Sequence, residues 1–307
     1  MNAMQNSSQR KFILTPIANI LQDTVTACNG IGRGIETQAL GEYVLQTTFL
    51  KMTGASEQKL KCICWEMATN DYDYRYRYLR KNYGECSSYE DKSSIYRDMV
   101  DMIVKLEPNF SVSNLFGDVD ISSKENELIE KKIKETQKRQ KVQKGRKLTD
   151  VDAQKLADGM RAYWGKKGLC ERERANFSRI VFFESMLDMV VGIIGDTLVA
   201  QWEQHNYLNY VKCWKGLASG DYALEGMLLG KTFQNFYTDV VYKHRNRCAH
   251  NLASFQNNLP TLKTLIDPGF VYNNYYYRFS MLILLDEIFV RLYKKYVDTL
   301  GQQVISQ

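Results

Sequence analysis

The residues with the clearest chemical potential lie together between Phe236 and Asn251, a stretch rich in arginine and histidine. The chain has only three histidines, and two of them, His244 and His250, fall in this stretch. Histidine exchanges protons near neutral pH, whereas arginine keeps its charge and matches phosphate oxygens with its planar guanidinium group. These residue types a few positions apart are therefore candidates for acid–base chemistry on a phosphate ester.

A helical pattern sorts this stretch into two faces. One stripe, which we expect to be the core face, recurs at steps of three and four and consists of Phe233, Tyr237, Val240, Val241, His244 and Cys248. Asn246 and His250 are four residues apart, so they are neighbours on the helix surface and lie away from the stripe. Arg245 projects between the two faces. We therefore expect His244 to pack inside and His250 to face solvent or a second surface.

The run Arg245-Asn246-Arg247-Cys248-Ala249-His250 resembles the Arg-polar-x-x-x-His motif of HEPN ribonucleases. The resemblance covers about the last half of the chain and transfers three positions, Arg245, Asn246 and His250. In that family a helical bundle places the motif in a groove between two units, usually two chains, and two motif copies form one RNA-cleaving site. The resemblance implies an endoribonuclease that works as a homodimer or a larger even oligomer. It also implies a role in antiphage defence or as a toxin, with an antitoxin or another defence-system protein as a candidate partner.

The chemistry of RNA cleavage suits these three residues and needs neither a metal nor a cofactor. RNA carries its own nucleophile, the 2′-hydroxyl group, so the site must move protons and stabilise charge on the phosphate. His250 would act as general acid or base, Arg245 would hold the scissile phosphate, and Asn246 would orient one or the other. The same residue types near a helix end also cap the helix and complement its dipole. A non-catalytic helical module that binds RNA or protein is therefore the alternative.

Two further segments have a composition suited to RNA. Between Tyr72 and Tyr83 aromatic and basic residues alternate, which indicates either base stacking with phosphate neutralisation or a helix end whose tyrosines pack. Lys124 to Lys147 is strongly basic and almost free of large apolar residues, which indicates either a solvated arm or an electrostatic site for RNA. A nucleic-acid-binding protein that depends on this arm is a third hypothesis. The candidate RNA-binding residues are Arg75, Arg77, Lys131, Lys132, Lys138, Arg139 and Lys141.

Composition predicts an all-α protein. Hydrophobic residues make up 44% of the 307, and only 4 prolines interrupt the chain. We predict a helical N-terminal region over 1–118, a charged linker or arm over 119–148, and a HEPN-like helical bundle over 149–307. Residues 1–11 are polar, and we expect them to be frayed. Helical patterns are expected at 12–28, 36–52, 56–81, 88–106, 176–194, 198–214 and 275–300. Glu184 interrupts the apolar face of its helix, and Arg245 or Arg247 is its expected partner.

Several other classes are disfavoured. The 7 cysteines form no CxxC pair, so we expect no zinc site and reduced thiols in a cytoplasmic protein. The acidic residues Asp118, Asp120, Glu125 and Glu127 lie in a predicted loop with no strand scaffold, which argues against a metallonuclease. No signal peptide opens the sequence, and the most apolar run, 189–200, is too short to cross a bilayer. The sequence therefore predicts a protein without a membrane partner.

Overall fold

The computed structural model describes residues 2–80, 85–121, 125, 129–130, 133–134, 150–167, 171–203, 207–220, 226–250 and 274–305. Within these ranges the protein is all-α and contains no strand, which confirms the predicted fold class. The α-helices are α1 (Asn2–Leu14), α2 (Ala18–Cys28), α3 (Gln38–Asn70), α4 (Tyr72–Arg80), α5 (Tyr89–Leu106), α7 (Asp150–Lys167), α8 (Glu171–Ile194), α9 (Leu198–Glu203), α10 (Tyr207–Gly220), α11 (Lys231–Phe236), α12 (Lys243–His250) and α14 (Tyr275–Ile305). Two short 3₁₀ turns, η1 (Ile35–Thr37) and η2 (Val112–Phe116), and a π-helix, η3 (Tyr237–Tyr242), complete the described elements.

The chain forms two compact units. Unit 1 combines residues 1–115 with 183–307, and unit 2 comprises residues 116–182. Unit 1 therefore contains helices from both ends of the sequence, including the helix of the Arg-Asn-x-x-x-His motif. The division of the chain into domains at 118/119 and 148/149 stays a prediction.

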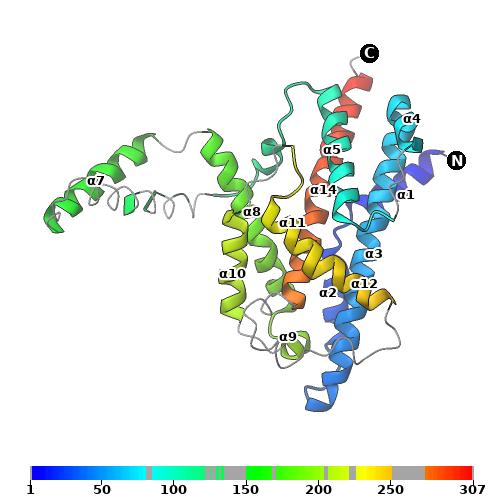
Figure 1. Cartoon of the computed structure of the whole chain (residues 1–307), viewed down its shortest axis with the longest axis horizontal. Helices are drawn as coiled ribbons and strands as arrows, with labels where there is room; N and C mark the ends of the chain where they lie inside the picture. Colours follow the sequence, from blue (N-terminus) through cyan, green and yellow to red (C-terminus); the bar gives the residue numbers. More distant parts are fainter. Residues whose placement is uncertain are drawn as a thin grey trace. The chain divides into compact units, whose positions relative to one another are not determined.

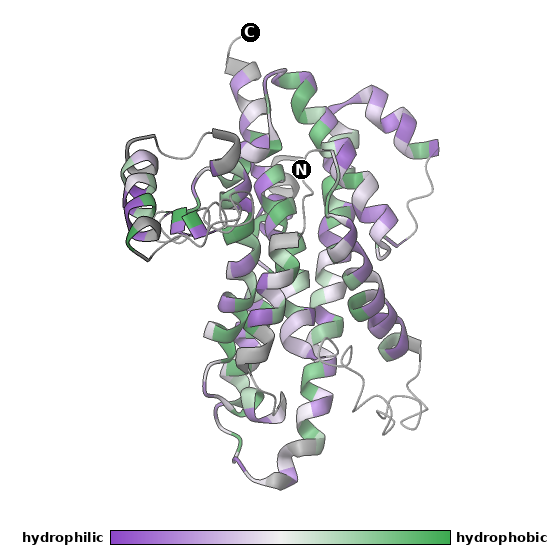
Figure 2. Ribbon diagram, turned by 60° about the vertical axis from the view of Figure 1, so that its left-hand side comes forward, coloured by the Kyte–Doolittle hydropathy of each residue, from purple (hydrophilic) through white to green (hydrophobic). Residues whose placement is uncertain are grey.

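The core of unit 1 is built around α14. Its residues from Tyr275 to Leu285 are all buried, because the helix packs against α5 and α3 along its length and also against α1 and α10 (Figure 1). Figure 2 shows hydrophilic and hydrophobic residues alternating along helices of this unit, as expected where a helix buries one side and exposes the other. N-terminal and C-terminal segments thus share a single core.

A buried ion pair joins α3 to α14, and the backbone just before α2 contacts it. Lys59 of α3 lies 2.7 Å from the carboxylate of Asp286 on α14, and both side chains are about 5% exposed. The backbone N–H of Ile17, just before α2, donates to the same carboxylate at 2.9 Å. Burial raises the pKa of Asp286, while the Lys59 ammonium group lowers it. Because both charges are out of water, removing either one would leave the other without compensation.

The structure corrects the N-terminal helix boundaries. The expected helices at 36–52 and 56–81 form α3, which continues through Gly54, and a separate α4 after Asp71. A glycine costs a helix about 1 kcal/mol, and the buried neighbours Met52, Thr53 and Ser56 pack well enough to exceed this cost. The expected helix at 12–28 is instead split at Pro16, and residues 2–14 form a helix of their own rather than a frayed end.

Other boundaries agree more closely. The helix expected at 88–106 is α5, whose first turn is capped by the Ser88 side chain as it accepts the Asp91 N–H at 3.0 Å. The helices expected at 176–194 and 275–300 lie within α8 and α14. The helix expected at 198–214 is divided into α9 and α10, and residues 204–206 between them lie outside the described ranges.

Unit 2 contains α7 and the first part of α8. Arg161 of α7 pairs with Glu130 at 2.5 Å and with Asp158 at 2.9 Å, and the rings of Phe116 and Phe182 lie 4.9 Å apart.

In the described part of the chain, no helix is both long enough and apolar enough to cross a membrane.

Candidate functional site

The motif lies on α12, the last part of a rod formed by α11, η3 and α12 (Figure 1). Within this rod α12 packs against α3, η3 against α14 and α11 against α10. The predicted core stripe is confirmed by burial, because Phe233, Tyr237, Val240, Val241 and Cys248 are all buried. His244 is partly buried. The stripe was predicted for a regular α-helix, but residues 237–242 form a π-helix. A π-turn widens the helix and shifts the phase of the residues that follow.

The π-helix is held from the core. Arg278 of α14 is only 5% exposed, and its Nε donates to the carbonyl oxygen of Val240 at 3.3 Å. The Tyr237 hydroxyl group donates to the carbonyl oxygen of Ser87 at 2.8 Å. These two bonds attach the segment before the motif to α14 on one side and to the loop before α5 on the other.

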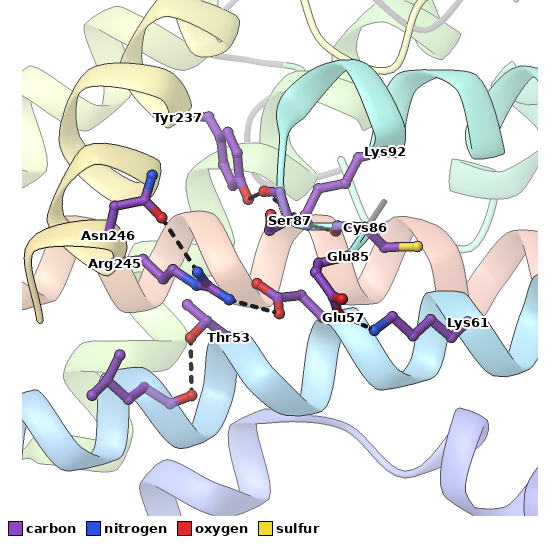
Figure 3. A network of polar contacts seen from close by, with 11 residues as sticks. Thr53, Glu57, Lys61, Glu85, Cys86, Ser87, Lys92, Tyr237, Arg245 and Asn246 are labelled. Atoms are coloured by element: carbon purple, nitrogen blue, oxygen red, sulfur yellow. Dashed lines mark hydrogen bonds and ion pairs between the residues drawn. The ribbon is translucent and has the colours of Figure 1, made fainter. Parts of the chain in front are cut away.

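Arg245 is the centre of a polar network (Figure 3). Its Nη2 lies 3.1 Å from Oε2 of Glu57 on α3, and its Nη1 donates to Oδ1 of the adjacent Asn246 at 3.3 Å. The Arg245 side chain is 24% exposed and that of Glu57 is 13% exposed. A guanidinium group has five N–H donors, so these two contacts leave further donors for a ligand. Glu57 therefore fixes the arginine without saturating it.

This ion pair corrects the expected partner of the motif arginine. Glu184 was expected to pair with Arg245 or Arg247, but Arg245 pairs with Glu57, which lies 188 positions away in sequence. Arg247 is exposed on the other edge of α12, and Glu184 is partly buried on α8. Nothing in the helical periodicity pointed to Glu57, because a single sequence does not indicate which distant helices meet.

A second group of residues closes one side of the network. Lys92 in the first turn of α5 is 1% exposed, and its Nζ donates to the carbonyl oxygens of Cys86 and Ser87 at 2.5 and 3.5 Å. Burial lowers the pKa of Lys92 from 10.5 to about 8, although the charge of Glu57 acts in the opposite direction. Burial also raises the pKa of Tyr237, and the Glu57 carboxylate adds to this effect. Lys92 and Tyr237 together hold the loop at residues 86–87 near Glu57. The sequence predicted Tyr237 only as a core residue, and it gave no signal for Lys92 or Glu57.

His244 is enclosed by other side chains and is unsuited to acid–base chemistry near neutral pH. Its Nε2 lies 3.2 Å from the Tyr275 hydroxyl and 3.4 Å from the Cys248 sulfur, and its ring lies 5.1 Å from that of Phe49. Burial, with the charges of Arg278 and Arg247, lowers the pKa of His244 from 6.5 to about 2. The ring is therefore neutral at physiological pH, as expected for a residue of the core stripe.

The structure brings Arg245 and Asn246 together and places His250 at the end of the same helix, one turn beyond Asn246. The side chain of His250 lies outside the described part of the chain. So do the candidate RNA-binding residues Lys131, Lys132, Lys138, Arg139 and Lys141, and their role stays a prediction.

The other two candidates, Arg75 and Arg77, are exposed on α4. The sequence left two alternatives for the tyrosines of this helix, packing against the protein or exposure for base stacking, and the structure shows both. Tyr74 is buried and stacks on Tyr78 with ring centroids 5.9 Å apart, whereas Tyr72 and Tyr76 are exposed. One side of α4 is therefore a packing surface, and the other presents aromatic rings and arginines to solvent.

Within the described ranges, no group of three or more His, Cys, Asp or Glu residues is arranged to hold a metal ion. The comparisons with known proteins add no assignment, since no family model, no curated protein and no solved structure matches the chain. The functional interpretation therefore depends on the residues and their geometry.

Proposed function

We propose that the protein is a metal-independent endoribonuclease whose site contains Arg245, Asn246 and His250. The observation that carries this proposal is the network around Arg245, in which a partly exposed guanidinium group is fixed by Glu57 beside Asn246. The arrangement resembles what the HEPN motif requires, an arginine held for a phosphate on the same helix as a histidine. The neutral, enclosed state of His244 leaves His250 as the histidine of the motif available for proton transfer.

The proposed reaction is an internal transesterification. The 2′-hydroxyl oxygen loses its proton to a general base and attacks the adjacent phosphorus, while the bond from phosphorus to the 5′-oxygen breaks. The leaving 5′-oxygen takes a proton from a general acid, so the products are a 2′,3′-cyclic phosphate and a 5′-hydroxyl group. His250 serves as acid or base, and Arg245 balances the charge that builds up on the phosphate oxygens.

Two copies of the motif are needed if the site is composite, as in the family that the motif resembles. Because the sequence contains one copy, we propose a homodimer or a larger even oligomer in which the α12 helices of two chains meet. We also propose a cytoplasmic protein of a defence or toxin system that acts on RNA, with an antitoxin or another defence protein as a partner. The HEPN resemblance supports the oligomer and the defence or toxin role, and the scattered cysteines without a CxxC pair support the cytoplasmic assignment.

One observation favours the non-catalytic alternative. The ion pair between Arg245 and Glu57 ties α12 to α3, and such a contact would also serve a helical module that binds RNA or protein without cleaving it. The two functions differ in what Arg245 must do. A structural arginine needs only its charge and its contact with Glu57, whereas a phosphate-binding arginine also needs its planar pair of donors.

The test compares Arg245→Lys with Arg247→Ala, a matched control at an exposed position on the same helix. Loss of a preorganised donor to the reacting phosphate typically lowers the rate by about 10²–10³-fold, so Arg245→Lys should lose cleavage of total RNA while Arg247→Ala retains it. Sedimentation of the wild-type protein should show an even oligomer. Full cleavage by Arg245→Lys, or full activity of a monomer, would contradict the proposal of a composite site.

A further inference from the structure

A row of side chains on α3 leads away from Arg245. Residues 53, 57, 61 and 65 are four positions apart, so they are successive neighbours on the helix surface. Glu57 holds Arg245, Lys61 comes one turn later, and Trp65 one turn after that. On an α-helix the rise from Glu57 to Trp65 is about 12 Å, which a short single strand spans. The row thus brings a guanidinium group, an ammonium group and an indole ring within reach of one polynucleotide.

The indole ring of Trp65 is exposed to solvent and contributes little to the core. It is 67% exposed, whereas Trp202 and Trp214 are buried. The indole N–H of Trp214 donates to the Phe183 carbonyl oxygen at 2.7 Å, and that of Trp202 donates to the Thr37 hydroxyl at 3.2 Å. A tryptophan gains most of its stabilising effect from burial of its large ring. A ring left in solvent on the row that begins at the proposed site is therefore a candidate for contact with a ligand.

Lys61 is available to the same ligand. It pairs with Glu85, whose side chain is 74% exposed, and water screens an exposed pair of this kind so strongly that it stabilises the fold little. Exchange of the Glu85 carboxylate for a phosphate would therefore cost little. The charge of Lys61 also acts on the pKa of Tyr78, which burial raises, so α4 lies close to this part of α3.

The charge of α4 favours a polyanion. Its residues 72–80 include three arginines, Arg75, Arg77 and Arg80, and one acidic residue, Asp73. All three arginines are exposed, and the guanidinium group of Arg80 lies 4.2 Å from the centre of the Tyr76 ring. Exposed aromatic rings among arginines are the combination by which proteins bind single strands, since bases stack on the rings and phosphates pair with the cations.

We propose that Trp65 and Lys61 form a binding surface for single-stranded RNA, in which Trp65 stacks on a base and Lys61 binds a phosphate of the strand whose scissile phosphate lies at Arg245. This rests on the proposed function, because the strand is the substrate of that site. A duplex does not fit the surface equally well, since paired bases are stacked on one another and do not present their faces to an indole ring.

The test measures binding in the full chain carrying His250→Ala, so that the RNA is not cut. The probe is a short, fluorescently labelled single-stranded RNA of mixed sequence, with its duplex as a second probe. Trp65→Ala should weaken single-strand binding by about 5- to 100-fold, the usual effect of losing one stacked base, and Trp65→Phe should weaken it less. Lys61→Met should reduce the slope of log affinity against log salt by about one. The matched control is Tyr43→Ala on the same helix, where the side chain is 68% exposed.

The outcomes separate this inference from the proposed function. Equal affinity of Trp65→Ala and Tyr43→Ala for the single strand overturns the inference, and if the wild-type protein still cleaves RNA the proposed function stands. Unchanged RNA affinity with weakened self-association of Trp65→Ala would also overturn it and would assign Trp65 to a protein contact. Weaker single-strand binding by Trp65→Ala, with no cleavage by the wild-type protein, would support the surface and overturn the nuclease.

Discussion

Two ion pairs begin on α3 only two residues apart. Lys59 pairs with Asp286 in the core, where both side chains are about 5% exposed, whereas Glu57 pairs with Arg245 at a partly exposed edge. Residues two apart on an α-helix point to nearly opposite sides, so one turn of α3 serves the core with one face and the candidate site with the other. The chemistry of the two pairs is similar, and burial makes the difference. The buried pair holds helices together, while the partly exposed pair leaves donors of Arg245 available for a ligand.

The largest expected effect comes from breaking the buried pair. Lys59→Met would leave the Asp286 carboxylate in the core without its cation, and we expect a loss of about 3–5 kcal/mol in the free energy of unfolding. Urea unfolding followed by circular dichroism measures it. The control is the double variant Lys59→Met with Asp286→Leu, which removes both charges and should recover most of the loss. A loss in the single variant below about 1 kcal/mol would show that the pair does not hold the core.

Breaking the partly exposed pair should affect function more than stability. Glu57→Ala is expected to lower the free energy of unfolding by about 1–2 kcal/mol, between the values for exposed and buried pairs. Because Arg245 would lose its orientation, we expect a drop in kcat of about tenfold or more, with a smaller change in KM. Glu57→Gln keeps a hydrogen-bond acceptor and should retain more activity than Glu57→Ala. An unchanged kcat in a folded Glu57→Ala variant would assign a purely structural role to the pair.

The smallest expected effect concerns His244, on the buried side of the motif helix. Its pKa is about 2 in the folded chain and about 6.5 when unfolded, so between these values the unfolded state binds more protons. Its contribution to stability is therefore complete above pH 6.5 and is lost progressively as the pH falls toward 2. Urea midpoints from pH 7 to pH 5 should decline less in His244→Phe than in the wild-type protein. Equal declines would mean that His244 is protonated in the folded state.

The sequence predicted the helices better than their contacts. The helix at 88–106 was recognisable because its apolar period, its Ser88 cap and Pro108 after its end agree, and the stripe from Phe233 to Cys248 was correct because burial follows periodicity. The two helices expected at 36–52 and 56–81 are continuous through residues 53–55, since the packing that stabilises this part of α3 is a tertiary effect. The π-helix and the partner of Arg245 were missed for a similar reason. Each depends on a side chain from a distant segment, Arg278 in one case and Glu57 in the other.

The most direct test of the account is cleavage of RNA in EDTA by the wild-type protein and by His250→Ala. Loss of a general acid or base lowers the rate by about a hundredfold or more. The free energy of unfolding of the variant should stay within about 0.5 kcal/mol of that of the wild-type protein. The account predicts that the wild-type protein cleaves RNA with chelator present and leaves a 2′,3′-cyclic phosphate and a 5′-hydroxyl group, and that folded His250→Ala scarcely cleaves. Retained cleavage by folded His250→Ala, or cleavage abolished by EDTA, would contradict it.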